Sequence, residues 1–297
     1  MRMKKSKSAF SDKTFDITRG AFLLIVFIAT LYPVIVIVSS SFSSAEALLS
    51  GRVKLLPVDF TLDGYKAVFQ NKTIWNGIGN SVFYTLVGSA VNLVVTILAA
   101  YPLSRNDFKP KTVISLMFAF TMWFGGGMIP EYLLVRGLGL LNTRLALIIP
   151  SAMSVWYMVI IRTYFQTNVG GELLEAAKID GCDDFRYLLQ IAIPLSKPVI
   201  AVVALYYIVG NWNVFTQAYL YIQDPNKFPI QVVLRDILLL SQTQDLASDV
   251  VSTTDSRMLS MLLKYSVIVI ASLPMFVIYP FVQKYFVKGI MVGSVKG

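Results

Sequence analysis

The chain has 297 residues, of which 56% are hydrophobic and only 14% are charged, and its mean hydropathy is +0.65. A soluble domain of this length carries far more charge on its surface, so the composition excludes a soluble globular protein and places the chain in a bilayer. The net charge of +9 fits basic loops beside anionic lipid headgroups better than it fits nucleic-acid binding. There is no His and only one Cys, Cys182, which argues against a metal site and against a disulfide scaffold.

Six segments lack Asp, Glu, Lys and Arg over about the 20 residues that a helix needs to cross a hydrocarbon core of about 30 Å. The shortest is bracketed by Arg144 and Arg162, whose side chains can reach back to the headgroups. The sequence therefore predicts an all-α integral membrane protein with six transmembrane helices, at residues 21–42, 77–103, 112–130, 145–161, 198–221 and 265–282.

The basic segment at residues 1–20 is not a secretory signal, because the apolar run after it is too long and no small-residue cleavage site follows. Six crossings place both termini on one side of the membrane. The short loop 104–111 carries three basic residues, so the positive-inside rule makes that side cytoplasmic. We therefore expect a cytoplasmic N-terminal segment at 1–20, a transmembrane domain at 21–288 and a cytoplasmic tail at 289–297.

No predicted span contains an ionisable side chain, whereas ion-coupled transporters and proton pumps need such groups inside the membrane. The chain also lacks the Gly-x-x-x-x-Gly-Lys-Ser/Thr run that would cradle ATP phosphates. If the chain forms a pore or a permease, transport through it is therefore either passive or driven by another protein. A driving protein would have to bind to the cytoplasmic loops.

The cytoplasmic segment 170–197 has the pattern of a helix, a sharp turn and a second helix. Polar and apolar residues alternate over residues 172–180, with carboxylates near the start, where they complement the helix dipole. Gly181 can supply a left-handed cap, and Asp183 or Asp184 can begin the second helix.

The second helix is expected to stop at Pro194 and to turn four residues toward an apolar surface: Phe185, Leu188, Leu189 and Ile193. In the first helix, small Ala176 and Ala177 would let another protein approach closely. That pattern favours a docking role, and the alternative is an amphipathic hairpin that rests on lipid.

This segment resembles the EAA loop of binding-protein-dependent ABC permeases. It reads EAA at residues 175–177, Gly after three more residues, and IAIP at residues 191–194 after another nine, as in the family pattern EAA-x3-G-x9-I-x-L-P with Ile for the usual Leu. The resemblance implies a type I ABC importer (MetI-like) permease fold. It also implies that the residues coupling the chain to an ATPase are Glu175, Ala176, Ala177, Asp180, Gly181 and Pro194.

Other stretches resemble the carbohydrate-uptake branch of this family. The tail 289–297 is similar to the Gly-rich, Lys-Gly-ending tail of MalG-like sugar permeases, and residues 139–143, 148–150 and 212–213 also look like this branch. The tail is expected either to contact the ATPases or to be a frayed terminus.

The resemblance implies a multi-pass subunit of the bacterial plasma (inner) membrane that imports a carbohydrate, with an oligosaccharide as the favoured cargo. Its partners would be a second homologous permease in a heterodimer, two ATPase subunits and an extracytoplasmic sugar-binding protein. ATP and Mg would bind to the ATPases, so we expect no cofactor, metal or catalytic residue on this chain.

Polar and aromatic residues at the fifth span could line a sugar path, since sugars bind to aromatic faces and amide groups. The alternative is that they hold helices together. The candidates are Asn211, Trp212, Asn213, Gln217 and Tyr219. Gly125–Gly127 and Pro130 could form a hinge or, as we favour, end a helix.

Three rival functions stay open from the sequence. Peptide, polyamine and phosphate importers share the EAA loop, and a passive channel would need no partner ATPase. A membrane-bound enzyme such as a lipid-linked glycosyltransferase would need a cluster of Asp, Glu or His at a membrane face, which the scattered outer acids do not provide.

Overall fold

A computed structural model describes residues 8–246 and 254–294, with side chains described for residues 15–240 and 258–280. Within these residues all regular structure is helical. The helices, in chain order, are α1 (Ser8–Ser41), α2 (Ala45–Leu49), α3 (Asp63–Gln70), α4 (Lys72–Ser104), α5 (Lys111–Trp123), α6 (Met128–Gly137), the 3-10 helix η1 (Arg144–Leu147), α7 (Val155–Asn168), α8 (Gly171–Ile179), α9 (Asp184–Tyr187), the π-helix η2 (Leu188–Ala192), α10 (Ile193–Leu195), α11 (Lys197–Trp212), α12 (Thr216–Tyr221), the 3-10 helix η3 (Pro225–Lys227), α13 (Ile230–Leu246) and α14 (Thr254–Ser294).

The chain divides into two compact units, and the first consists of Met1–Asn71 and Asp236–Ile270. Its longest helix, α1, has no buried residue in its most apolar window, so this surface needs lipid or another subunit around it. The segment after α1 is held by the buried Ser43, whose hydroxyl donates to the Ser39 carbonyl and accepts from the Val58 amide. Phe42 stacks on Phe60 with ring centroids 5.6 Å apart.

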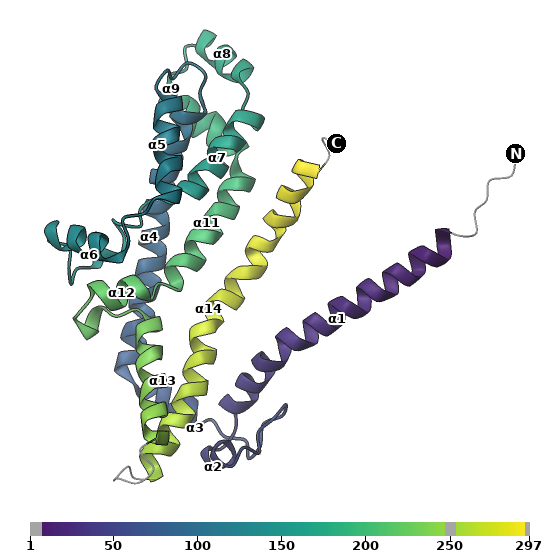
Figure 1. The fold of residues 1–297 in the computed structure, drawn as a ribbon, viewed down its shortest axis with the longest axis vertical. Helices are drawn as coiled ribbons and strands as arrows, with labels where there is room; N and C mark the ends of the chain where they lie inside the picture. The colour runs from purple at the N-terminus through teal and green to yellow at the C-terminus, as the bar shows by residue number, and fades with distance from the viewer. Residues whose placement is uncertain (1–7, 247–253, 295–297) are drawn as a thin grey trace, which may run out of the picture. The chain divides into compact units, whose positions relative to one another are not determined.

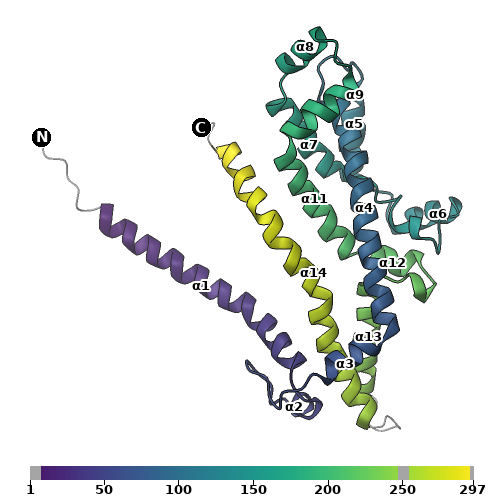
Figure 2. The same cartoon turned by 180° about the vertical axis from the view of Figure 1, so that it is seen from behind.

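The second unit consists of Lys72–Arg235 and Ala271–Gly297. Helices α4, α5, α7 and α11 run alongside one another, and α8 and α9 lie together at one end of them, as Figure 1 and the reverse view in Figure 2 show. Their core reaches into the segment 170–197, so that segment is packed onto the helices and does not float free of them. The fully buried members of this core are Ala100, Leu103, Met158, Ile161, Phe165, Ala177, Tyr187, Leu188, Ala192, Val203 and Tyr207.

A second apolar cluster lies nearer the N-terminal end of α4. Tyr84 of α4 packs there with Val135 of α6, Leu147 of η1 and Tyr221 of α12. The Tyr84 hydroxyl also donates to the Lys227 carbonyl at 2.9 Å. This cluster therefore ties three short helices to α4, far along the helix from the segment 170–197.

Three helices are long and apolar enough to cross a membrane, and the number is five if each of two bent helix pairs forms one span. This count covers only the described residues. The continuous helices agree with the first, second and sixth predicted spans, and they cover Phe15–Ser41, Lys72–Ser104 and Met258–Pro280.

The third and fifth predicted spans are broken rather than continuous. After α5 the chain passes through Gly125–Gly127 and turns by 117° into α6, and Gly127 has φ +83°, which only glycine adopts readily. This confirms that the glycine stretch ends a helix. In the fifth span, α11 ends at Trp212 and α12 starts anew at Thr216. Hydropathy alone does not register these breaks, because the broken segments are as apolar as intact ones.

The fourth predicted span has the wrong boundaries. The helix α7 begins at Val155 and ends at Asn168, whereas residues 148–154 form turns that include Pro150. Arg162 consequently lies inside the helix rather than at its edge. Its Nε donates to the Leu103 carbonyl at 3.1 Å, so the charge satisfies a backbone group near the end of α4. The predicted tail 289–297 continues α14 as far as Ser294, and its last three residues lie outside the described part of the chain.

Candidate functional site

The segment 170–197 forms the predicted helix, turn and second helix. The turn after α8 has Gly181 at φ +76°, with its amide donating to the Lys178 carbonyl at 3.1 Å and the Cys182 amide donating to the Ala177 carbonyl at 2.9 Å. These two bonds satisfy carbonyls that the end of α8 would otherwise leave unpaired. The left-handed glycine cap predicted from the sequence is confirmed.

The second helix begins as expected but does not stop where expected. The Asp183 carboxylate accepts the Arg186 amide at 2.8 Å and so caps α9, which confirms one of the two predicted caps. Pro194 does not end the helix, because the chain continues through α10 to Leu195. The preceding turn is the π-helix η2, whose wider spacing accommodates a residue that has no amide hydrogen to donate. The chain then bends by 84° into α11.

The two alanines of the motif face in opposite directions. Ala176 is exposed, whereas Ala177 is 7% exposed and belongs to the core that α4, α7 and α11 share with this segment. The prediction that both alanines admit a partner protein is therefore wrong for Ala177, which instead lets α8 approach its own chain closely. Of the four apolar residues predicted to face inward, Leu188 is buried and Ile193 is half-buried, whereas Phe185 and Leu189 are exposed, so the prediction is wrong for these two.

The outer side of the segment is unusually apolar for a surface in water. Ile179 is 87% exposed, and Leu173 and Phe185 are also exposed. Glu175 and Asp180 are exposed as well. A docking partner that covered these residues would remove the exposed apolar area from water and would meet carboxylates at its edge.

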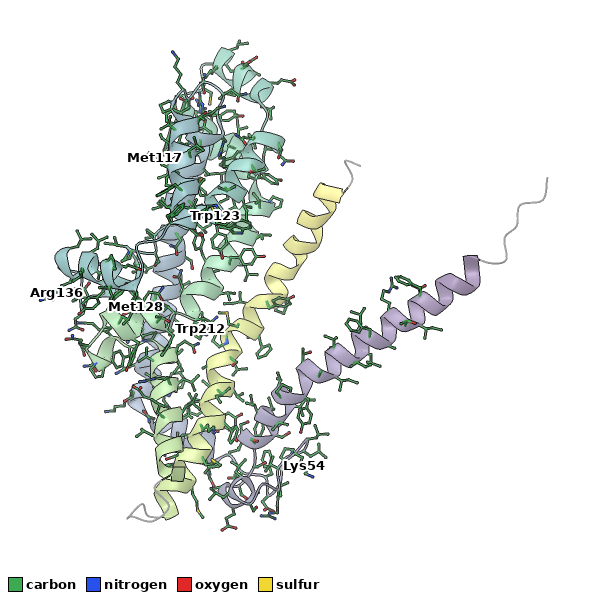
Figure 3. The ribbon with its side chains drawn as sticks, viewed as in Figure 1. Lys54, Met117, Trp123, Met128, Arg136 and Trp212 are labelled. Carbon is green, nitrogen blue, oxygen red and sulfur yellow. The ribbon has the colours of Figure 1, made fainter. Side chains whose placement is uncertain are left out.

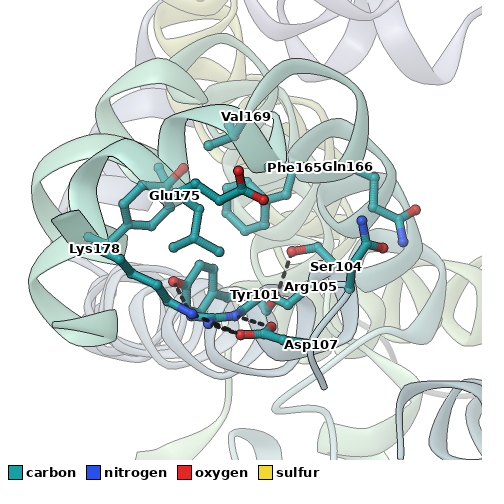
Figure 4. Close-up of a pocket in the computed structure, with 14 residues that line it drawn as sticks. Tyr101, Ser104, Arg105, Asp107, Phe165, Gln166, Val169, Glu175 and Lys178 are labelled. Atoms are coloured by element: carbon teal, nitrogen blue, oxygen red, sulfur yellow. Dashed lines mark hydrogen bonds and ion pairs between the residues drawn. The ribbon is translucent and has the colours of Figure 1, made fainter. Parts of the chain in front are cut away.

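Four charged residues connect this segment to the loop after α4, as Figure 4 shows for three of them. Arg105 pairs with Asp107 in its own loop and with Asp184 at the start of α9. The Nζ of Lys178 in α8 donates to Oδ2 of Asp107 at 3.1 Å. The hydrogen bond from Arg105 holds the pKa of Asp107 well below its usual range, so this carboxylate stays ionised.

A pocket of about 290 Å³ lies beside this ion network. Its walls include Tyr101, Phe165 and Glu175, so it opens between α4, α7 and α8. The hydroxyl of Tyr187, which also lines it, is buried and has no partner among the described side chains and backbone groups.

A second pocket, of about 360 Å³, lies between α4, α7, α11 and α12. Three predicted path residues line it: Asn211, Asn213 and Gln217. Three tyrosines that the sequence reasoning missed also line it: Tyr157, Tyr206 and Tyr207. The rings of Tyr157 and Tyr206 stack with centroids 5.5 Å apart and planes within 7° of parallel. No charged residue is among those that line this pocket.

Polar contacts join the pocket to the helices around it. The Asn211 amide donates to the Asn92 side chain at 2.8 Å, and the Tyr207 and Thr96 hydroxyls lie 2.7 Å apart. Asn211 therefore both lines the pocket and links α11 to α4. A signal for the tyrosines was present in the sequence, since Tyr157, Tyr206 and Tyr207 interrupt otherwise aliphatic runs.

Trp212 and Tyr219 lie outside the pocket. Trp212 is 3% exposed, and its indole nitrogen donates to the Ala271 carbonyl at 3.1 Å, so it holds α11 to α14 (Figure 3). Tyr219 is exposed, and the guanidinium of Arg235 lies 4.4 Å from the centre of its ring. Three of the five residues predicted for the sugar path therefore line this pocket and two do not, and a substrate contact of any of them stays a prediction.

Comparison with known proteins shows which family the chain resembles. A model of the family described as "Binding-protein-dependent transport system inner membrane component" matches residues 13–292. Protein LplC of Bacillus subtilis (strain 168) is 43% identical over 97% of this chain and 96% of its own length. The polygalacturonan/rhamnogalacturonan transport system permease protein YtcP of the same organism is 40% identical over 96% of this chain and 99% of its own.

The fold is also similar to a solved structure. A chain in the crystal structure of a bacterial ABC transporter involved in the import of the acidic polysaccharide alginate superposes with a TM-score of 0.84 and 32% identity, over 96% of this chain and 100% of that one.

Proposed function

This chain belongs to the family of binding-protein-dependent transport system inner membrane components, and we propose that it forms half of the translocation path of an ABC importer for a carbohydrate, with an oligosaccharide as cargo. As a member of this family the chain is a transport subunit and not an enzyme, and it lies in the bacterial inner membrane with several spans. ATP is hydrolysed by separate ATPase subunits, and a substrate-binding protein delivers the cargo.

The coupling role is supported by the way the segment 170–197 is buried on one side and exposed on the other. Its inner side is fixed to the core by Ala177, while Ala176 and Ile179 are exposed. A rigid helix with one anchored and one exposed side can pass a push from an ATPase to the membrane helices. In this proposal the residues that couple to the ATPase are Glu175, Ala176, Asp180 and Gly181, while the buried Ala177 and the exposed Pro194 shape the segment.

The carbohydrate assignment is supported by two independent facts. The relatives YtcP and the alginate transporter carry polysaccharide names, and the pocket beside α11 combines a stacked tyrosine pair with side-chain amides. Aromatic faces and amides are the groups that bind the apolar faces and hydroxyls of a sugar ring. The uncharged lining supplies no counter-charge, so we expect this pocket to favour neutral glycosyl units over uronates.

The remaining parts of the proposal concern assembly. We propose a heterodimer with a second, homologous permease, with two ATPase subunits beneath it. The basic loop 104–111 supports a cytoplasmic position for the segment 170–197 and for both termini. In this arrangement ATP and Mg²⁺ are bound by the ATPases, and this chain holds no cofactor. The tail 289–297 would reach toward the ATPases from the same side.

The experiment is uptake into proteoliposomes that contain this chain with the permease and ATPase encoded beside it. Radiolabelled neutral and uronic oligosaccharides are supplied outside with the purified binding protein, and ATP is enclosed within. We expect uptake only with ATP and binding protein together. A matched complex in which the ATPase cannot hydrolyse ATP is the control.

Two results would contradict the proposal. Uptake that persists without ATP would show a passive channel. Uptake of a peptide, a polyamine or phosphate that oligosaccharides do not compete with would keep the importer and overturn the carbohydrate cargo.

A further inference from the structure

The coupling segment shares an apolar core with the helices that line the sugar pocket, and two further connections join them. One is the chain itself, which enters the segment from α7 and leaves it through η2 and α10 into α11. The exit contains a π-helical turn and then a bend of 84°. These breaks separate α9 from α11, so a movement of α8 and α9 has no unbroken helix to follow into α11.

The other connection is ionic and runs to α4 through Arg105. The Arg105 guanidinium donates to Asp107 through Nε at 2.8 Å and to the Tyr101 hydroxyl at 3.0 Å, and it also pairs with Asp184. Its side chain is only 10% exposed, whereas the side chains of Asp107 and Asp184 are 49% and 62% exposed. With Lys178 on Asp107, both helices of the coupling segment are held to one point (Figure 4).

Geometry makes arginine the residue suited to this position. A guanidinium is planar, has five donors in a fixed arrangement and can bond several acceptors at once. Here it joins two carboxylates from different segments and a tyrosine hydroxyl, and its centre lies 5.6 Å from the Tyr101 ring. A lysine would keep the charge but could not span these acceptors from one rigid group.

The ionic connection leads directly to the pocket along α4. Tyr101 belongs to α4, and one unbroken helix joins it to Thr96 and Asn92. Nine residues of helix span about 14 Å. Asn92 lines the pocket and accepts from Asn211, and Thr96 bonds to Tyr207, so a shift of α4 moves the pocket wall.

We infer that Arg105 is a positioning residue that transmits movement of the coupling segment to α4 and thereby opens or closes the sugar pocket. The inference rests on the proposed function, because it assigns a task to that same machinery. It predicts that breaking the Arg105 network leaves the subunits assembled and separates ATP hydrolysis from transport.

The test uses the complete complex in proteoliposomes, with Arg105→Lys and Asp184→Asn as variants. Asp184→Glu keeps the carboxylate and serves as the conservative rescue. Lys109→Gln removes a positive charge from the same exposed loop, at a residue for which the structure gives no ion pair, and is the matched control. The number of ATP molecules hydrolysed per solute transported is measured for each, together with the amount of ATPase that co-purifies.

We expect Arg105→Lys and Asp184→Asn to raise the number of ATP molecules hydrolysed per solute about 5- to 10-fold. This is the low end of the range of coupling factors between two linked sites, which is about 5- to 150-fold. Co-purification of the ATPase should be unchanged. Asp184→Glu should lie nearer the wild type than Asp184→Asn, and Lys109→Gln should match the wild type.

A second measurement reports on the segment itself. Cys182 is the only cysteine, so a nitroxide attached to it reads the mobility of the coupling turn in the assembled complex. Arg105→Lys should sharpen its spectrum, because the segment loses its ionic attachment to α4 and keeps only the apolar one.

An unchanged ATP cost per solute, an unchanged spectrum, or loss of the ATPase from the complex would each overturn the inference. Failure of the proposed function is seen separately, in the wild-type complex. If that complex imports a different solute, the ratio is measured with that solute and the inference about Arg105 is still tested.

Discussion

Replacing Gly181 with valine tests the coupling role most directly. The residue has φ +76°, and a Cβ built on it meets no atom within 4 Å, so the cost of a side chain is one of backbone conformation and not of collision. A residue other than glycine pays about 1–2 kcal/mol in this region, and a β-branched residue pays more. If the turn leaves this conformation instead, two backbone hydrogen bonds worth about 1 kcal/mol each are lost.

Either route costs about 2 kcal/mol, which lowers the population of the native turn about 30-fold. Because this turn sets the direction of α8, we expect ATP-driven uptake by Gly181→Val to fall at least about 10-fold, with the protein still present in the membrane. Initial uptake rates are measured in proteoliposomes and divided by the amount of reconstituted permease.

The matched control is Gly181→Asn, because asparagine tolerates the left-handed conformation far better than valine. It adds a side chain at the same exposed site and should retain most of the uptake. The reasoning is refuted if the valine variant transports at the wild-type rate, or if asparagine and valine impair transport equally.

Three further predictions follow from the packing. Ala177→Glu puts a charge into the core at a cost of several kcal/mol and should abolish uptake. Ala176→Glu changes an exposed residue and should leave the permease folded and alter only ATPase binding. Equal melting temperatures of the two variants would contradict this prediction. Trp212→Phe removes the hydrogen bond to the Ala271 carbonyl, worth about 0.5–1.5 kcal/mol, so thermal stability in detergent should drop without a change in sugar selectivity. Altered selectivity at unchanged stability would disprove this. Tyr206→Ala should raise the KM for oligosaccharide uptake about 10-fold, because it removes one ring of the stacked pair. Tyr219→Ala is the control, since Tyr219 lies outside the pocket. Equal effects of the two variants on KM would show that the pocket does not bind the sugar.

Much of this molecule follows from local chemistry and was predictable. Apolar runs of sufficient length gave the positions of α1, α4 and the membrane part of α14, because a bilayer core tolerates little else. The cap at Gly181 and the start of α9 at Asp183 were also predictable, since each depends on residues within one helical turn. The spacing of the EAA motif over residues 175–194 placed the predicted coupling segment, because the motif can be read directly from the sequence.

Two other helix breaks inside apolar segments were not predictable from composition, unlike the break at Gly125–Gly127. The late start of α7 and the separation of α11 from α12 depend on contacts between distant residues, such as Asn92 with Ser151 and Asn211. Trp212 and Asn211 are neighbours in the sequence, and both were candidates for the sugar path on sequence grounds. Only packing decides that one holds α14 while the other faces a pocket.

The sequence by itself determined that the chain spans a membrane, where the EAA segment 170–197 lies and that the chain lacks a nucleotide-binding run. Those features are set by hydropathy and by short-range hydrogen bonding, which need no knowledge of the fold. The tertiary structure decided which alanine of the motif points inward, that Arg105 gathers two carboxylates from different segments, and that three tyrosines surround one pocket. Such facts arise from contacts between residues up to about a hundred positions apart, and periodicity along a single chain carries no record of them.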